Sequence, residues 1–214
     1  MDGGRILRFP AKGLYAITQT DNKSAETIIK EVVAAIKGGA VVVQYRDKNP
    51  LDAIALAAQL VKVCHEYHVP LLINDDVDLA IAVGADGVHI GKEDGAIAYA
   101  RDRLGAEAII GASCYNAVER ALEAQAQGAT YVAFGRFFPS NSKPLAAPAE
   151  LTTLQAAKLK ISVPTVAIGG ILPENAGQLL NAGADLLAVI GGLFDKDDIE
   201  ASARQYKALF EPKS

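Results

Sequence analysis

The sequence predicts a single α/β domain of the (β/α)8 or TIM-barrel class, in which eight parallel strands close into a barrel and a helix follows each strand. Two observations predict this class: short β-branched runs alternate with helical stretches, and pairs of small or rigid residues recur just before the strands. The chain has 214 residues, of which 50% are hydrophobic and 21% charged. We expect the barrel to occupy residues 1–214, with a short N-terminal extension over 1–12.

Eight runs rich in β-branched and other apolar residues are the predicted strands. They are residues 14–18, 41–45, 71–73, 87–90, 108–110, 130–134, 165–168 and 186–190. The stretches between them carry apolar residues at helical spacing, which predicts helices with one buried face. Examples of this spacing are Ile28, Val32, Ala35 and Ile36, and again Ile54, Leu56, Leu60 and Val63.

Six of these strands are preceded by a recurring pair. Gly-Ala stands at 39–40, 84–85, 128–129 and 183–184, and Val-Pro stands at 69–70 and 163–164. Glycine suits the left-handed residue that ends a helix, and proline suits the first residue of a strand. The competing fold is an open, doubly wound sheet, which favours a glycine-rich turn after the first strand. Residues 18–21 read Thr-Gln-Thr-Asp instead, so the closed barrel is preferred.

Composition narrows the classes of partner. The formal net charge is −4, which argues against a nucleic-acid partner held by bulk positive charge. The first ten residues lack the apolar core of a signal peptide, and no apolar run is long enough to span a bilayer, so we expect a cytoplasmic protein with no membrane partner. Cys64 and Cys114 form no CxxC motif, which disfavours a disulfide framework or a cysteine zinc site and favours a reducing compartment.

The first candidate site follows the second strand. Reactive groups of a barrel stand at the C-terminal ends of its strands, and here the strand ends in Gln44, Tyr45, Arg46, Asp47 and Lys48. Strand alternation places Gln44, Arg46 and Lys48 on one side, at the barrel mouth. An amide and two cations suit a diphosphate. The alternative is a solvated basic strand end.

Carboxylates follow the third and fourth strands and predict a metal site. Asn74, Asp75 and Asp76 follow the third strand, and Asp94 lies beyond the fourth. Oxygen ligands joined by substrate phosphate oxygens are the usual environment of Mg²⁺. We favour Asp75 and Asp94 as the ligands and Asp76 as a helix cap. Helix capping is also the alternative role for Asp75 and Asp94.

We expect the histidines not to form a metal site and Ser113 not to act as a nucleophile. His65 and His68 fall on a helix outside the barrel, and His89, at the end of the fourth strand, is expected to pack or hydrogen-bond. Ser113, expected at the end of the fifth strand, has no apparent base in the sequence, so a hydrogen bond to substrate is the preferred role.

The last three strands predict a second anion site. Backbone N–H groups of glycine-rich loops after the seventh and eighth strands commonly bind phosphate in this fold. The alternatives to a phosphate site are an ordinary polar loop after the sixth strand and simple tight turns at the glycine pairs after the seventh and eighth. The residues concerned are Ser140, Asn141, Ser142 and Lys143 after the sixth strand, Gly169 and Gly170 after the seventh, and Gly191 and Gly192 after the eighth. Of these, Lys143 is grouped with Arg46 and Lys48 in the cationic site, and the other site is built from backbone around Gly170 and Gly191. The rim is therefore expected to bind two phosphorylated small molecules.

Taken in order, these motifs resemble the thiamine-phosphate synthase family. The matching segments are 43–48, 73–76, 84–94, 110–113, 131–143 and 166–171, within a resemblance that runs from about 13 to 194. The resemblance implies a (β/α)8 transferase of thiamine biosynthesis. It joins 4-amino-5-hydroxymethyl-2-methylpyrimidine diphosphate to a thiazole phosphate, releasing thiamine phosphate and diphosphate, with Mg²⁺ as cofactor.

The resemblance also implies a role for each candidate residue. The pyrimidine diphosphate would be bound by Gln44, Tyr45, Arg46, Asp47, Lys48, Asn74, Ser113 and Lys143. The thiazole phosphate would be bound by Ser140, Asn141, Ser142, Gly170, Ile190 and Gly191, and Mg²⁺ by Asp75 and Asp94. Diphosphate would leave with its charge held by the metal, Arg46, Lys48 and Lys143, and no protein nucleophile is needed. The family usually has threonine at positions 140 and 142, and often serine at 191.

Two other functions share parts of this pattern. A thiazole tautomerase of related fold would use the thiazole-phosphate site without a complete diphosphate and metal set. A non-catalytic ligand-binding barrel would not need Asp75, Asp94 and Lys143 together. The oligomeric state is open, with a homodimer as the candidate assembly.

Overall fold

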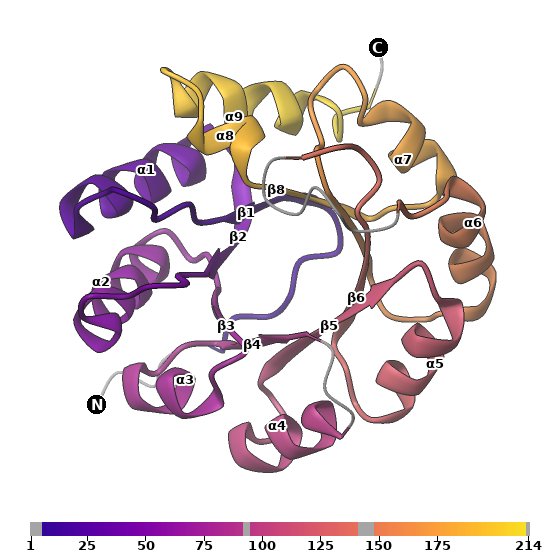
Figure 1. Ribbon diagram of the computed structural model, residues 1–214, viewed down its shortest axis with the longest axis horizontal. Helices are drawn as coiled ribbons and strands as arrows, with labels where there is room; N and C mark the ends of the chain where they lie inside the picture. The colour runs from indigo at the N-terminus through magenta and orange to yellow at the C-terminus, as the bar shows by residue number, and fades with distance from the viewer. Residues whose placement is uncertain (1–5, 92–94, 141–147, 213–214) are drawn as a thin grey trace.

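Eight parallel strands form a closed barrel in the order of the chain. The computed structural model describes residues 6–91, 95–140 and 148–212. β1 pairs with both β2 and β8, which closes the sheet, and helices surround it (Figure 1). The predicted (β/α)8 barrel is confirmed, and the open sheet is excluded. The strands are β1 Gly13–Ile17, β2 Ala40–Tyr45, β3 Leu71–Asn74, β4 Gly87–Ile90, β5 Ile109–Tyr115, β6 Tyr131–Phe134, β7 Thr165–Ile168 and β8 Leu186–Val189.

Helices follow the strands throughout the described chain. They are α1 Ala25–Gly38, α2 Ala53–Glu66, α3 Val77–Val83, α4 Ala96–Leu104, α5 Val118–Ala126, α6 Leu151–Lys160, α7 Gly177–Ala182, α8 Gly191–Phe194 and α9 Ile199–Ala208. β8 is followed by two helices, the four-residue α8 and then α9. Among the described residues, no helix combines the length and apolar character that a bilayer crossing requires.

The recurring pairs before the strands act as predicted. Gly39, Gly84, Gly128 and Gly183 all have positive φ values, between 68° and 122°, which glycine adopts without a Cβ penalty. Each lies at the end of a helix and turns the chain toward the next strand. The carbonyl oxygens of Pro70 and Pro164 accept the backbone N–H groups of Val43 and Val132, both at 3.1 Å, so each proline still contributes to the sheet.

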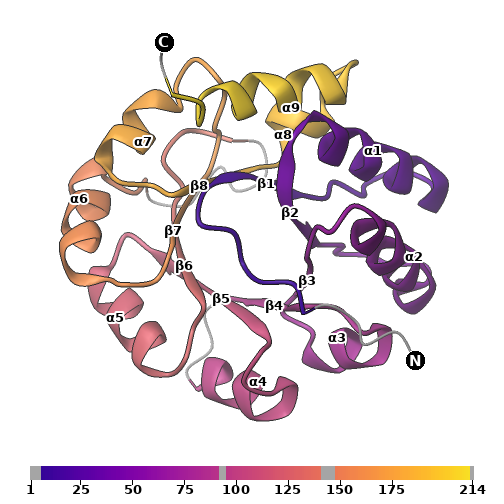
Figure 2. The same cartoon turned by 180° about the vertical axis from the view of Figure 1, so that it is seen from behind.

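The apolar residues form two cores. The larger one lies between the barrel and its helices, and the smaller one fills the barrel interior. The interior core contains Tyr15 and Tyr131, and Phe9 packs against it from the segment before β1. The Phe9 ring stacks on Tyr131, with centroids 4.1 Å apart. Figure 2 shows this indigo N-terminal segment crossing one end of the barrel.

Two sequence-based expectations are wrong in detail. β5 runs from Ile109 to Tyr115, so Ser113 lies inside the strand rather than at its end. On α2, Ile54 is 60% exposed, and the buried stripe is Leu56, Ala57, Leu60, Val61 and Cys64. Apolar residues lie on more than one face of this helix, so the helical period alone does not decide which face is buried. Packing buries the face that includes Ala57 and Cys64.

Candidate active site

A pocket of about 480 Å³ opens at the C-terminal ends of β2 to β5. It brings together residues that lie far apart in the sequence, because parallel strands present these ends at one rim. The predicted site residues that line it are Tyr45, Arg46, Asp47, Lys48, Asn74, Asp75 and Ser113. His89 and Gly91 line it as well.

Hydrogen bonds to the backbone fix the segment that carries the cations of the pocket. The Arg46 N–H donates to Thr18 Oγ1 at 2.9 Å, and Thr18 Oγ1 donates to the Arg46 carbonyl oxygen at 3.1 Å. Asp47 accepts from Asn49 N–H at 3.0 Å and from the Tyr45 hydroxyl at 3.2 Å. Within the described chain, the guanidinium of Arg46 has no acceptor, so this cation is available to an anion in the pocket.

Tyr45 stays a neutral hydrogen-bond donor. Burial, followed by the negative charges of Asp47 and Asp52, raises the pKa of its hydroxyl above the usual value for tyrosine. The Tyr45–Asp47 hydrogen bond therefore orders the loop that carries Arg46 and Lys48. β2 ends at Tyr45, so the predicted alternation does not continue through Lys48, and Tyr45 and Asp47 reach the same pocket as the cations.

The two aspartates after β3 have different positions. Asp76 caps α3, with its Oδ1 accepting the Leu79 N–H at 2.8 Å, as predicted. Asp75 adopts a left-handed backbone conformation, with φ of 58°. Its Oδ1 accepts the Gly91 N–H at 2.7 Å and its Oδ2 accepts the Asn74 amide at 3.0 Å. Asp75 thus points toward β4 and lines the pocket.

Gln44 lies deeper than predicted. It is 2% exposed, and its amide nitrogen donates to the Tyr15 hydroxyl at 2.7 Å inside the barrel. Because the strand side chain at position 44 faces inward and β2 continues to Tyr45, Gln44 lies below the rim rather than on it. Its predicted role in binding the pyrimidine stays a prediction.

Ser113 has a neighbour that the sequence did not reveal. His89 Nε2 lies 2.8 Å from Ser113 Oγ, and His89 Nδ1 lies 2.7 Å from the Tyr131 hydroxyl. No pattern in the sequence showed this partner of Ser113, which arises because β4 and β5 are adjacent strands and bring the two side chains together. His89 does hydrogen-bond, as predicted. Tyr15 and Tyr131 were not expected at the site, and their only signal was a tyrosine at an inward position of β1 and of β6.

The loops after β6, β7 and β8 pack against one another. Phe137 and Phe138 donate backbone N–H groups to Ile168 and Gly169, at 3.2 and 3.0 Å. A Cβ on Gly170 would lie 2.5 Å from the Pro139 carbonyl oxygen, so only glycine permits this approach beside Ser140.

The predicted phosphate-binding glycines lie at this second part of the rim. Gly191 is the first residue of α8, directly after Ile190. In the described part of the chain, the backbone N–H groups of Gly170 and Gly191 have no acceptor. These groups are therefore available to an anion. Asp94, Asn141, Ser142 and Lys143, which the sequence also assigns to the site, lie outside the described residues.

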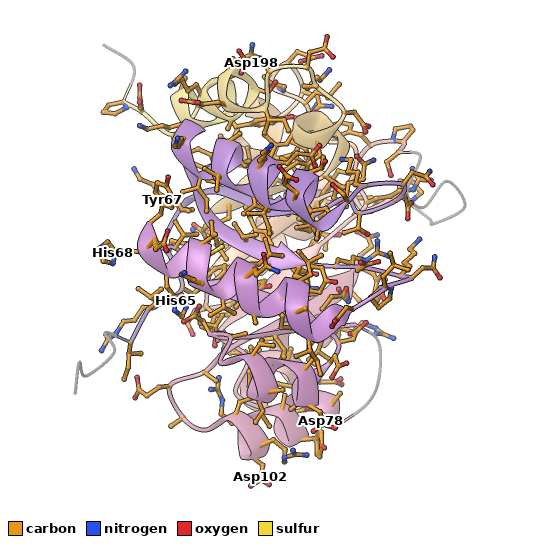
Figure 3. The ribbon with its side chains drawn as sticks, turned by 90° about the vertical axis from the view of Figure 1, so that its left-hand side faces the viewer. His65, Tyr67, His68, Asp78, Asp102 and Asp198 are labelled. Carbon is orange, nitrogen blue, oxygen red and sulfur yellow. The ribbon has the colours of Figure 1, made fainter. Side chains whose placement is uncertain are left out.

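The remaining histidines lie away from the pocket. His65 Nε2 lies 2.8 Å from Asp86 Oδ2, and Figure 3 shows the labelled His65 and His68 together at one end of α2, on the outer surface. Their position on the outer surface, away from the barrel mouth, agrees with the prediction. In the residues that the structure describes, no group of three or more His, Cys, Asp or Glu side chains could hold a metal ion.

The fold and the site together define a (β/α)8-barrel enzyme, with polar groups collected at the C-terminal ends of its strands. The family model for thiamine monophosphate synthase matches residues 14–193. The chain belongs to that family.

Individual relatives agree with this assignment. The chain is 47% identical to the thiamine-phosphate synthase of Methylococcus capsulatus, over 98% of this chain and 94% of the relative. It is 50% identical to the enzyme of the same name from Alcanivorax borkumensis, over 93% and 94% of the two chains. A solved structure of thiamine phosphate pyrophosphorylase from Pyrococcus furiosus superposes with a TM-score of 0.83 at 34% identity, covering 93% of this chain and 95% of that one. The predicted family, the predicted thiamine-phosphate synthase function and the predicted transferase class are confirmed.

Proposed function

We propose that the chain joins the pyrimidine diphosphate to the thiazole phosphate across this rim. The pyrimidine diphosphate binds in the pocket at the ends of β2 to β5, and the thiazole phosphate binds at the loops after β6, β7 and β8. The observation that carries this proposal is the gathering of Arg46, Lys48, Asn74 and Asp75 around one pocket of about 480 Å³. A diphosphate needs such cations and a metal ligand, whereas a single phosphate needs only backbone donors.

Arg46 and Lys48 stabilise the departing diphosphate in this proposal. The C–O bond at the pyrimidine methylene breaks, the electron pair leaves with the diphosphate, and the thiazole nitrogen then forms the new C–N bond. Negative charge grows on the leaving oxygen, so cations already aimed at it lower the barrier. The hydrogen bonds to Thr18 hold the Arg46 backbone in place before substrate arrives. By resemblance, Lys143 contributes a third cation.

Asp75 fits a ligand of Mg²⁺. Its carboxylate lines the pocket, and each oxygen accepts one hydrogen bond, from Gly91 and from Asn74, which leaves further lone pairs for a metal. Those two hydrogen bonds orient a hard oxygen donor toward the place proposed for the diphosphate. When bound, Mg²⁺ neutralises charge on diphosphate oxygens. Asp94 is the proposed second ligand, on the resemblance alone.

The reaction is tested directly with the purified protein, both substrates and Mg²⁺. Formation of thiamine phosphate with an equal amount of diphosphate supports the proposal. Conversion of a thiazole tautomer without any condensation would favour the tautomerase function, and binding without turnover would favour a ligand-binding barrel.

A matched pair of variants tests the metal ligand. Asp75→Asn keeps the size of the side chain and tolerates the left-handed backbone, but it removes the charge. We expect its rate to fall at least about a hundredfold. Asp76→Asn keeps a good helix cap, so it should retain near-normal activity. Equal activity of the two variants, or full turnover in excess chelator, would contradict the assignment of Asp75.

A cytoplasmic location and a homodimer are the remaining proposals. Both free cysteines, Cys64 and Cys114, are buried, which is compatible with a reducing compartment. Sedimentation of the purified protein over a range of concentrations tests the dimer, and a single species at the monomer mass would contradict it.

A further inference from the structure

Five polar side chains form a continuous hydrogen-bonded chain through the barrel. Gln44 Nε2 lies 2.7 Å from the Tyr15 hydroxyl, which lies 2.7 Å from the Tyr131 hydroxyl. Tyr131 lies 2.7 Å from His89 Nδ1, and His89 Nε2 lies 2.8 Å from Ser113 Oγ. The chain therefore crosses β2, β1, β6, β4 and β5 and reaches the pocket at His89 and Ser113.

The chain has a single direction of donation. Burial raises the pKa of both Tyr15 and Tyr131, so both phenols are neutral and each has one hydrogen to donate. The Gln44 amide nitrogen only donates, so Tyr15 accepts from it and donates to Tyr131. Tyr131 then donates to His89 Nδ1, and a ring nitrogen that accepts carries no hydrogen, so the ring hydrogen of His89 lies on Nε2. Ser113 accepts that hydrogen, and its own hydroxyl hydrogen remains for a partner in the pocket.

The packing holds Tyr131 in the middle of this chain. Its ring stacks on Phe9, with centroids 4.1 Å apart and planes within 7° of each other. A Cβ on Gly111 would lie 2.1 Å from the tip of the Tyr131 ring, so glycine at this position gives the phenol its path to His89. Tyr131 is fully buried. The hydroxyl is thus fixed by contacts on both sides rather than by its hydrogen bonds alone.

We infer that Tyr131, with Tyr15 and His89, is a positioning residue that fixes Ser113 as a hydrogen-bond donor to a ring nitrogen of the aminopyrimidine. This inference rests on the proposed function for the identity of the ligand. A ring nitrogen of an aminopyrimidine is an acceptor, so a serine held as a donor selects the ring and its orientation. The reverse direction of donation would instead let His89 withdraw the Ser113 proton and activate it as a nucleophile.

The hydrogen position on His89 gives a direct test that does not depend on activity. In the wild-type protein at neutral pH, nitrogen NMR of labelled histidine should show the hydrogen of His89 on Nε2. The His89→Asn variant assigns the signal, because that variant loses it. A hydrogen on Nδ1, or a charged ring with hydrogens on both nitrogens, would overturn the inference even where every variant folds.

Kinetics of Tyr131→Phe give the second test. The variant keeps the ring and its stacking on Phe9 but removes the hydroxyl between Tyr15 and His89. We expect kcat/KM for the pyrimidine diphosphate to fall about tenfold, the effect of one misdirected hydrogen bond, while KM for the thiazole phosphate stays within about twofold. Tyr206→Phe is the matched control, because it also removes a fully buried phenol hydroxyl, one that donates to the Ile171 carbonyl oxygen at 2.9 Å. It should leave KM for the pyrimidine diphosphate unchanged.

A double variant shows whether Tyr131 acts through Ser113. Adding Tyr131→Phe to Ser113→Ala should cost little beyond Ser113→Ala alone, because the donor that Tyr131 orients is already absent. Independent, multiplicative losses would overturn the inference, as would an unchanged Tyr131→Phe enzyme. If the wild-type protein makes no thiamine phosphate, the proposed function fails instead, and the NMR experiment still tests the direction of the hydrogen-bonded chain.

Discussion

Asp86 and Asp185, at the N-terminal end of the barrel, have matched surroundings. Asp86 Oδ2 accepts the first N–H of β3, from Leu71, at 2.8 Å, and Asp185 Oδ2 accepts the first N–H of β7, from Thr165, at 2.9 Å. Each carboxylate also contacts a nitrogen of a helix side chain, His65 Nε2 or Lys158 Nζ. At the C-terminal end, Asp75 accepts two hydrogen bonds but keeps an exposed carboxylate beside the pocket.

Non-glycine residues with positive φ occur at both ends, and His68, which precedes β3 at the N-terminal end, has φ of 56°. Asp75 and Tyr115, at the C-terminal ends of β3 and β5, have positive φ values of 58° and 55°. Such conformations cost about 1–3 kcal/mol each in a residue that is not glycine, and they cluster at functional sites. At the N-terminal end, Arg101 donates to the carbonyl oxygens of Ala108 and Gly128, at 2.6 and 2.7 Å. One end of the barrel uses its polar groups for stability, and the other holds them ready for a ligand.

The largest expected effect is a loss of stability at the N-terminal end. In Gly87→Ala, the new Cβ would lie 1.7 Å from the Ile109 carbonyl oxygen, so β4 would have to separate from β5. We expect the free energy of unfolding to fall by at least about 3 kcal/mol, measured by urea denaturation. Gly177→Ala is the control, because nothing lies within 4 Å of its Cβ position on α7. Equal stability of the two variants would contradict a close approach of β4 and β5 at Gly87.

Arg46→Ala should show the opposite pattern. Its guanidinium has no acceptor among the described residues, so unfolding should change by less than about 0.5 kcal/mol. The activation barrier for turnover of the pyrimidine diphosphate should rise by about 2–3 kcal/mol, measured as a fall in rate by steady-state kinetics. Arg46→Lys, which keeps the charge, should recover part of the rate. A variant that loses stability but keeps its rate would place Arg46 in the fold rather than in the site.

The sequence predicts the features that depend on local patterns of residues better than those that depend on contacts between strands. The strands, the glycines that end the helices and the Asp76 cap depend on local patterns of residues, and each was confirmed. The neighbours of Ser113 and Gln44 depend on contacts between different strands. No local pattern shows that His89 reaches Ser113, because the two are 24 residues apart and meet only once β4 and β5 pair.

The extent of β5 also escaped prediction. Gly111, Ala112 and Ser113 are weak strand formers, so residues 109–115 do not resemble a strand by propensity. Pairing with β4 and β6 overrides that preference. Position 111 requires glycine because the Tyr131 ring occupies the space that a side chain would need, and this contact exists only in the folded barrel.

Asp185→Ala, also at the N-terminal end, should lower the free energy of unfolding by less than Gly87→Ala does. It leaves the N–H of Thr165 without its acceptor, which costs about 1–3 kcal/mol of unfolding free energy. Asp185→Asn keeps an oxygen for that N–H and loses only the ion pair with half-exposed Lys158, so it should cost less than about 1 kcal/mol. Kinetic constants of both variants should match the wild type. A fall in kcat in either would show that the two ends are coupled.

The two cysteines should give the smallest effect on catalysis. Burial raises the pKa of Cys64 and of Cys114 to about 12, so both thiols are neutral and unreactive at pH 8. Because the folded pKa exceeds the unfolded one, the neutral thiols favour the fold fully below the unfolded pKa, and this contribution is lost as pH rises toward 12. Iodoacetamide at pH 8 should label neither cysteine in the native protein and both in urea, and Cys64→Ala with Cys114→Ala should keep the wild-type kinetic constants. Fast labelling of the native protein would contradict the burial of the thiols. A folded double variant without activity would place a thiol in the reaction and contradict a site that works by position and charge alone.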